Sequence, residues 1–254
     1  MLKNGKKDNL TYKVFETRAE MGEYAAAEAA KEIAAQIGRK GTINMIFAAA
    51  PSQNEFLAAL ISHSEIDWSR INAFHMDEYI GLDPLAPQGF GNFLKNAIFG
   101  KVPFASVNYI NCAASDPYSE SDRYAALLKE HPCDIICMGI GENGHIAFND
   151  PAVADFHDKK AVKPVTLDNV CRQQQVNDGC FASIDQVPQQ ALTLTIPTLI
   201  APDSVFCIVP AATKANAVYN TINGEISESC PASILRTHKN AVLYLDKDSA
   251  SLLG

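Results

Sequence analysis

Residues 133–151 read Cys-Asp-Ile-Ile-Cys-Met-Gly-Ile-Gly-Glu-Asn-Gly-His-Ile-Ala-Phe-Asn-Asp-Pro and contain the clearest fold signal of the chain. The apolar run at 133–138 is typical of a buried strand. Three glycines within the next six residues allow the backbone to turn sharply where that strand ends. The same loop contains His145 and Asp150. This stretch therefore predicts a strand that ends in a loop with functional side chains.

On both sides of this stretch, apolar runs of strand length alternate with segments of helical periodicity. No repeat, linker or abrupt change of composition divides the chain. The alternation predicts one α/β domain over residues 1–254 with three layers, a largely parallel, Rossmann-like sheet between helices on both faces. We predict helices over 19–37, from Ser52 onward, and over 93–99, 119–130 and 213–222, and strands over 42–49, 71–76, 107–111, 133–138, 191–196, 205–209 and 241–245.

Composition excludes several classes of protein. With 254 residues, a formal charge of −8 and 47% hydrophobic residues, the chain can bury a full core. The acidic balance argues against nucleic-acid and anionic-membrane partners. Residues 1–10 are polar, and no run approaches the roughly 20 apolar residues that cross a bilayer. Seven cysteines without a Cys-x-x-Cys pair do not indicate a zinc site. We expect a reduced, cytoplasmic protein.

Functional residues of such a sheet are expected just after the carboxyl ends of its strands. Residues 48–54 leave one strand and open a helix, where backbone N–H groups and the Ser52 hydroxyl can hold a phosphate. An alternative of equal weight is that Ser52 only caps its own helix, with Glu55 in the capping-box position.

A second strand ends in two adjacent carboxylates, Asp77 and Glu78. Neighbouring side chains in extended backbone point to opposite sides, so only one of them can face a cleft. A carboxylate in such a cleft is partly desolvated, which raises its pKa and suits it to abstract a proton beside a carbonyl. A solvated turn is the alternative interpretation of this pair.

The glycine-rich loop has two interpretations of its own. Gly139, Gly141 and Gly144 match the dinucleotide-binding pattern Gly-x-Gly-x-x-Gly. However, the residues after Gly144 do not open as an amphipathic helix, and the match lies in mid-chain. We therefore favour a proton shuttle in which the carboxylate of Asp150 orients the imidazole of His145.

Two long motifs resemble the glucosamine-6-phosphate deaminase (isomerase) family, which shares its fold with the 6-phosphogluconolactonases. They are Phe-His-Met-Asp-Glu-Tyr-Ile-Gly-Leu at 74–82 and Gly-Ile-Gly-Glu-Asn-Gly-His-Ile-Ala-Phe-Asn-Asp-Pro at 139–151. Val187-Pro-x-x-Ala-Leu-Thr and Lys214 also follow in the order that the family leads us to expect. The similarity extends over most of the chain.

This resemblance implies that Asp77 is the base that moves a proton between C1 and C2 of an open-chain amino-sugar phosphate. It also implies that His145 assists opening of the pyranose ring and that Asp150 orients it. Asn143, counted with the catalytic group, stands where the family typically has Asp, and Asp150 stands where it usually has Glu. The implied substrate- and phosphate-binding residues are Ala49, Ala50, Ser52, Gln53, Gly141, Gly144 and Lys214.

The resemblance implies no metal and no cofactor, and by analogy it allows a homo-oligomer. The family's later substrate-side arginine has no clear counterpart, because Gln173, Gln174 and Gln175 occupy its neighbourhood after Arg172. In addition, the family's phosphate loops are rich in Gly and Thr, whereas residues 48–53 read Ala-Ala-Ala-Pro-Ser-Gln.

The leading functional prediction is an aldose–ketose isomerase and deaminase. It would convert glucosamine 6-phosphate, or a close amino-sugar phosphate such as galactosamine 6-phosphate, to ketose 6-phosphate and ammonia. One alternative is a 6-phosphogluconolactonase-type hydrolase in which His145 activates water. The other is a non-catalytic sugar-phosphate-binding protein. In each case the partner is a small-molecule sugar phosphate.

Overall fold

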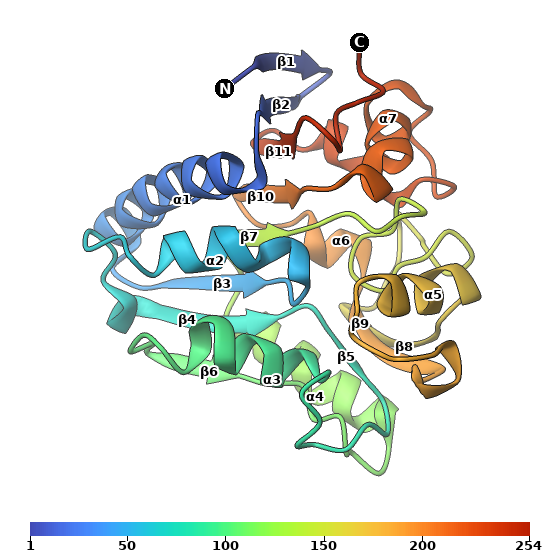
Figure 1. Ribbon diagram of the computed structural model, residues 1–254. Coiled ribbons are helices and arrows are strands. Elements are labelled where there is room, and N and C mark those ends of the chain that lie inside the picture. Colours follow the sequence, from blue (N-terminus) through green and yellow to red (C-terminus); the bar gives the residue numbers. More distant parts are fainter.

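An eight-stranded, mostly parallel sheet organises the molecule (Figure 1), and the computed structural model describes residues 1–254. Its strands lie in the order β1-β2-β11-β10-β7-β3-β4-β6, and only the β1/β2 pair is antiparallel. Their bounds are Lys3–Lys7 (β1), Leu10–Phe15 (β2), Ile43–Phe47 (β3), Ile71–His75 (β4), Ser106–Asn108 (β6), Ile135–Met138 (β7), Ser204–Val209 (β10) and Ala241–Asp246 (β11).

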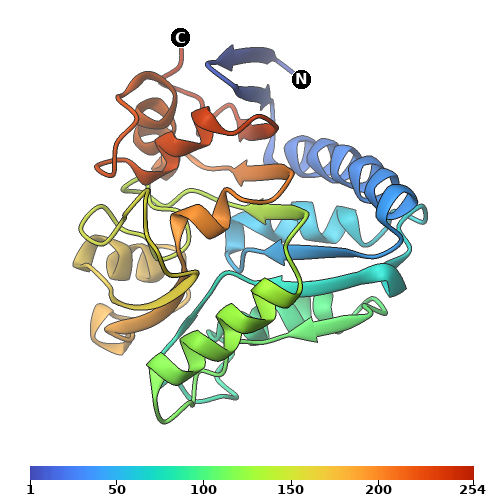
Figure 2. The ribbon, with the colours of Figure 1, turned by 180° about the vertical axis from the view of Figure 1, so that it is seen from behind.

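Helices cover both faces of this sheet, as Figures 1 and 2 show. Side chains along β3 alternate between two apolar clusters, with Met45 and Phe47 in one and Ile46 in the other. No helix is both long and apolar enough to cross a membrane. The three-layer α/β prediction is confirmed. The first cluster lies under α1 (Arg18–Lys40), α2 (Asn54–Leu60) and α3 (Phe90–Leu94), and the second under α4 (Pro117–Glu130), α6 (Ile196–Leu199) and α7 (Ala215–Asn223).

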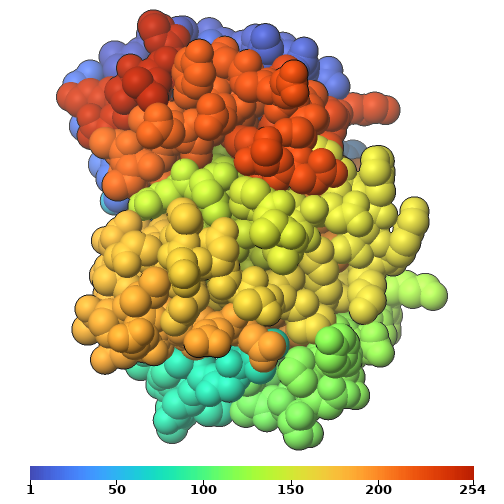
Figure 3. Space-filling view, turned by 90° about the vertical axis from the view of Figure 1, so that its right-hand side faces the viewer, coloured from blue at the N-terminus to red at the C-terminus, as the bar shows by residue number.

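A small antiparallel sheet stands at the carboxyl-end side of the main one. Its order is β5 (Asp77–Tyr79), β9 (Gln190–Leu194) and β8 (Val162–Thr166), and α5 (Asn169–Asn177) follows β8 on the same side (Figure 1). Figure 3 looks onto this side, where the yellow and gold segment forms a band between the carboxyl-terminal part and the green part of the chain. β5 follows β4 almost directly, so the small sheet holds Asp77 at the end of a main-sheet strand.

Several elements differ from the sequence prediction. Residues 1–10 contain β1, whose side chains are almost all exposed, so no apolar alternation marks it. The strand expected at 191–196 forms as β9, in the small sheet and antiparallel to both neighbours. β2, β5, β8, α5 and α6 were not predicted, although Leu10 and Val14 of β2 are buried and could have indicated a strand there. Helices expected to start at 93 and 119 start at 90 and 117.

A buried tyrosine of α4 fixes the end of β4. The Tyr124 hydroxyl accepts a hydrogen bond from the His75 N–H at 3.0 Å and lies 2.9 Å from the carbonyl oxygen of His75. The His75 ring accepts from the Ile110 N–H at 2.9 Å and lies 3.0 Å from the Asp77 carbonyl. Burial lowers the pKa of His75 to about 4, so the ring stays neutral and supports the turn that leads to Asp77.

We expect Tyr124→Phe to lower the free energy of unfolding by about 1–3 kcal/mol, because it leaves buried backbone groups of His75 without a partner. The matched control is Tyr118→Phe on the same helix, where the tyrosine is 63% exposed. We expect that control to change stability by less than about 0.5 kcal/mol. Urea unfolding measures the stability of both variants. Equal effects of the two substitutions would contradict the structural role assigned to the Tyr124 hydroxyl.

Candidate active site

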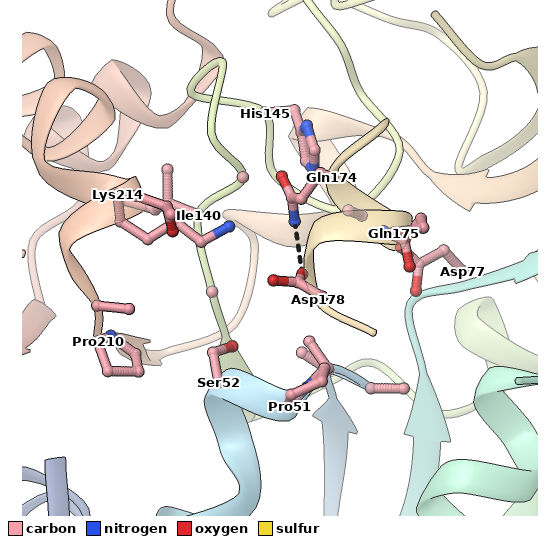
Figure 4. Close-up of a pocket in the computed structure, with 18 of the residues that line it drawn as sticks. Pro51, Ser52, Asp77, Ile140, His145, Gln174, Gln175, Asp178, Pro210 and Lys214 are labelled. Atoms are coloured by element: carbon pink, nitrogen blue, oxygen red, sulfur yellow. Dashed lines mark hydrogen bonds between the residues drawn. The ribbon is translucent and has the colours of Figure 1, made fainter. Parts of the chain in front are cut away.

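A pocket opens at the carboxyl ends of β3, β4, β7 and β10, where the functional loops were expected (Figure 4). It brings together side chains from four segments that are far apart in sequence. Among the residues predicted for the site, its wall contains Ala49, Ala50, Ser52, Asp77, Gly141, His145 and Lys214. The others, Gln53, Asn143, Gly144 and Asp150, do not line it and stand behind those that do.

Asp77 and Glu78 face different surroundings. Asp77 lines the pocket and is 7% exposed, and burial, followed by the charge of Glu78, raises its pKa well above the usual range. Glu78 turns away and accepts hydrogen bonds from the backbone N–H groups of Tyr79, Phe90 and Gly91 at 2.9, 3.0 and 2.8 Å. Glu78 therefore anchors the following loop, and Asp77 is the carboxyl group available to a ligand.

The imidazole of His145 is oriented by two polar side chains. Its Nδ1 lies 2.7 Å from Oδ1 of Asn143 and 2.9 Å from Oδ1 of Asp150. The amide of Asn143 donates to Asp150 at 3.0 Å, and its Oδ1 also accepts from the His145 N–H at 3.1 Å. Nδ1 therefore carries the proton in the neutral ring, which leaves the Nε2 lone pair free. Although burial opposes ionisation, the contacts with His145 and Asn143 lower the pKa of Asp150.

Cys171 of α5 completes the surroundings of Asp150. Burial, together with the charges of Asp150 and Asp168, raises the pKa of the Cys171 thiol, so it stays protonated at neutral pH. The donor atoms of His145, Asp150 and Cys171 all lie within 4.8 Å of one another. No other three side chains of the types that bind metals (His, Cys, Asp and Glu) are grouped in this way in the chain.

Two glycines of the loop have different tasks. A methyl group on Gly141 would overlap the His145 ring, so only glycine lets the imidazole lie against the backbone there. Gly144 has a φ of +85° and packs against Cys230. Gly141 shapes the pocket directly, whereas Gly144 makes the turn and touches no pocket surface.

Ser52 does not cap its helix, and the expected capping box is wrong. Pro51 starts the helical turn, with Ala50 in the cap position, so Ser52 lies inside the first turn. Glu55 instead pairs with Arg18, Nε to Oε1 at 2.9 Å. The Ser52 oxygen accepts from Nε2 of Gln53 at 3.1 Å, which leaves its O–H free to donate into the pocket.

Lys214 presents a buried ammonium group to the pocket. It ends a short helical turn after β10 and is 5% exposed. It has no ion-pair or hydrogen-bond partner within the chain; burial lowers its pKa, whereas the nearby charges of Asp178 and Glu142 raise it. A buried cation without a direct partner is costly, so this end of the pocket favours an anion.

An ammonium group and a carboxyl group thus occupy opposite ends of the pocket. Figure 4 shows Lys214 and Ser52 on one side, Asp77 on the other, and His145 between and above them. An elongated ligand with an anionic tail can place its other end between the Asp77 carboxyl and the His145 imidazole. Those two groups can exchange protons with it.

Sequence reasoning missed several residues of the wall. Asp178 lines the pocket and accepts from Gln174 Nε2 at 3.3 Å, and Gln175 lies beside Asp77 in Figure 4. Arg172, in contrast, donates to backbone carbonyls of Ile184 and Val187 at 2.7 and 3.0 Å. Asp168 is the one residue whose type could have indicated the start of α5 in the sequence. It caps this helix by accepting a hydrogen bond from the Cys171 N–H at 2.7 Å. The other wall residues not predicted include Arg18, Phe90, Phe148 and Thr213.

Comparison with known proteins gives a consistent result. The sequence model of the family described as glucosamine-6-phosphate isomerases/6-phosphogluconolactonase matches residues 16–244. The glucosamine-6-phosphate deaminase of Streptococcus sanguinis is 33% identical over 232 residues, which are 91% of this chain and 94% of that protein. The glucosamine-6-phosphate deaminase of Listeria monocytogenes is 31% identical over 229 residues, 90% of this chain and 96% of that one.

Solved structures agree with these relatives. A monomeric glucosamine-6-phosphate deaminase is 30% identical and superposes with a TM-score of 0.86, covering 95% of this chain and 99% of that chain. The 6-phosphogluconolactonase of Thermotoga maritima is 16% identical, with a TM-score of 0.76 over 94% of this chain and 100% of that chain. The latter likeness concerns the fold alone.

We expect Asp77→Asn to stabilise the protein at neutral pH. The native pKa of Asp77 is raised, so the folded chain binds this proton more tightly than the unfolded chain. The stabilisation from this tighter proton binding is fully present below the ordinary pKa of an aspartate. It is lost as pH rises, by about 1.4 kcal/mol per pH unit, until Asp77 ionises. Asp77→Asn should therefore unfold at a higher temperature than the wild type at about pH 7, with the gap closing toward about pH 4.

Calorimetric unfolding across this pH range tests that expectation. The control is Asp83→Asn, which changes an exposed carboxylate a few residues further along the same loop. We expect its unfolding temperature to follow that of the wild type at every pH. A difference between Asp77→Asn and the wild type that grows as pH falls would contradict the raised pKa.

Lys214 and Asp178 should have opposite effects on anion binding. Lys214→Met removes the ammonium group and should weaken the binding of inorganic phosphate about 10- to 100-fold. Asp178→Asn removes a negative charge that acts on Lys214 and should strengthen binding about two- to tenfold. Titration calorimetry measures both, with the exposed Asp185→Asn as control. Unchanged affinity in Lys214→Met would show that the anion site lies elsewhere.

Proposed function

Because the chain belongs to the glucosamine-6-phosphate isomerase/6-phosphogluconolactonase family, we propose that it converts glucosamine 6-phosphate to ketose 6-phosphate and ammonia. A close amino-sugar phosphate such as galactosamine 6-phosphate is the other candidate substrate. The observation that carries this proposal is the placement of Asp77. A buried carboxyl group with a raised pKa faces the same pocket as an imidazole with a free Nε2.

The phosphoryl group is proposed to bind at the Lys214 end. The ammonium supplies a counter-charge, and the Ser52 hydroxyl donates a hydrogen bond. Gln53 orients Ser52 from outside the pocket wall. Its buried Nε2 donates hydrogen bonds to the Ser52 oxygen at 3.1 Å and to the Ile208 carbonyl oxygen at 3.2 Å. Ala49 and Ala50 form the adjoining wall.

The sugar end of the substrate then reaches His145. Opening of the pyranose ring needs the proton of the C1 hydroxyl to leave and a proton to reach the ring oxygen. The free Nε2 of His145 is the acceptor proposed for this exchange. Asn143 and Asp150 keep Nδ1 protonated, so Nε2 remains basic.

Isomerisation is proposed to use Asp77 as a single base between two adjacent carbons. The ionised carboxylate takes the proton from C2 of the open-chain aldehyde while the C1 oxygen gains a proton from solvent, which gives an enol-amine. Asp77 then returns its proton to C1, which leaves a protonated imine at C2. Water then adds to the resulting C2 imine, and ammonia leaves as the C2 carbonyl forms. A raised pKa increases the basicity of Asp77, which suits proton abstraction from carbon. Asp77 and His145 are the two groups proposed to transfer protons in this sequence.

The seven cysteines form no disulfides, which supports the cytoplasmic location expected from the sequence.

The decisive experiment measures ammonia and ketose phosphate separately from glucosamine 6-phosphate. Asp77→Asn should lower kcat by at least about 1,000-fold while the substrate Kd changes only a few-fold. Asp83→Asn is the matched control and should keep the wild-type rate. In deuterated water, the wild type should also exchange the C2 proton of the substrate.

Three results would contradict the proposal. Undiminished turnover in Asp77→Asn would remove the proposed base. Hydrolysis of 6-phosphogluconolactone without C2 exchange would favour the hydrolase alternative. Tight binding of the sugar phosphate without release of ammonia would favour a non-catalytic binding protein.

A further inference from the structure

The group formed by His145, Asp150 and Cys171 offers donors of three kinds. One nitrogen, one carboxylate oxygen and one sulfur lie within 4.8 Å of one another, and the three residues are 7%, 1% and 0% exposed. They come from the glycine-rich loop, its far end and α5. Proton transfer as proposed above uses His145 and Asp150 and gives Cys171 no role.

One oxygen of this group has no hydrogen bond of normal geometry. Oδ1 of Asp150 contacts both Asn143 and His145, whereas Oδ2 is buried without such a bond, and Cys171 is the remaining side chain that contacts this carboxylate. An unpaired buried carboxylate oxygen costs free energy that a ligand can recover. A second carboxylate, Asp168, lies 3.4 Å from the Asn143 amide and adds negative charge nearby. Both features favour a cation at this position.

We propose that His145, Asp150 and Cys171 bind a thiophilic divalent cation, for which Zn²⁺ is the best match. Imidazole, carboxylate and thiolate are all common zinc ligands, and three protein ligands leave the fourth tetrahedral position to water. Zn²⁺ together with one carboxylate and one thiolate is electrically neutral, so the buried group gains no net charge. The Oδ2 atom of Asp150 is the oxygen available for the bond.

Binding requires two proton movements. The thiol proton of Cys171 leaves to solvent as the Zn–S bond forms. The proton on Nδ1 of His145 leaves that atom, and Nε2 takes one up, as Nδ1 becomes a ligand. One proton is therefore released for each zinc ion, and the imidazole ends in the opposite tautomer.

This change gives the site an inhibitory effect, an inference that rests on the proposed function. With a proton on Nε2, His145 can no longer accept one from the sugar. The metal thus competes with the proton relay and not with the phosphate end. The cation site itself depends only on the three donors and is tested without substrate.

Co²⁺ serves as the spectroscopic probe of the metal-free enzyme. We expect wild type to show the thiolate-to-cobalt charge-transfer band and the intense visible bands of tetrahedral Co²⁺. Cys171→Ser should lack the charge-transfer band, and Cys180→Ser, which removes another thiol of the same region, should keep it. Absence of the band from wild type, or its presence in Cys171→Ser, would overturn the site.

Zn²⁺ inhibition tests the effect on activity, with each protein compared with its own metal-free rate. We expect Cys171→Ser to need at least about tenfold more Zn²⁺ for half-inhibition than wild type or Cys180→Ser. Equal sensitivity of all three proteins would overturn the inhibitory effect. An enzyme that shows the cobalt band but releases no ammonia would refute the proposed function and leave the metal site standing.

Proton release gives a test on wild type alone, in case Cys171→Ser folds poorly. Calorimetric titration of Zn²⁺ in buffers of different ionisation enthalpy should report about one proton released per ion at neutral pH. No proton release would mean that the thiol is not a ligand, and it would overturn the proposal.

Discussion

Parallel pairing of β10, β7, β3 and β4 is the constraint on which the site depends. These strands bury both faces, so helices must cover both sides and only the loops at the strand ends remain free for ligands. Because parallel strands end at the same edge, loops that are distant in sequence meet there. Ser52, Asp77, His145 and Lys214 come from four such loops. Taken alone, a segment such as the one at Ser52 or at Asp77 can be explained as a helix cap or a solvated turn. The sheet brings the four segments together to form one pocket.

Lys214 and Asp77 lie far apart in the pocket, and burial shifts the pKa of each. It lowers the pKa of Lys214 and raises that of Asp77, so each group resists its charged form. They stand at opposite ends (Figure 4), and neither neutralises the other. An anionic tail supplies the missing counter-charge at Lys214 and leaves Asp77 basic. The proposed anion site therefore depends on the local placement of Lys214 and not on the formal charge of −8.

The sequence supported the parts of the fold that have strong periodicity. The apolar strands around residues 133–138 and 205–209, and the turns after them, formed where expected. Polar elements such as β1 and α5 give little periodic signal, because tertiary contacts and not local propensity stabilise them. The pocket residue Asp178 therefore escaped notice, and Gln174 was noted only as a departure from the family pattern. Which of Asp77 and Glu78 faces the pocket also needed the structure, because alternation predicts opposite sides without saying which is which.

An amide at position 143 determines the hydrogen bonds around the proposed proton acceptor, His145. Asn143 accepts from His145 and donates to Asp150, and a carboxylate there could not donate. Two carboxylates at this distance would repel each other and raise the pKa of one of them. With Asn143, the pair next to the imidazole has a single negative charge. Hydrogen bonds then determine the tautomer of His145, and the ring keeps Nε2 open to the pocket while Asp150 stays ionised.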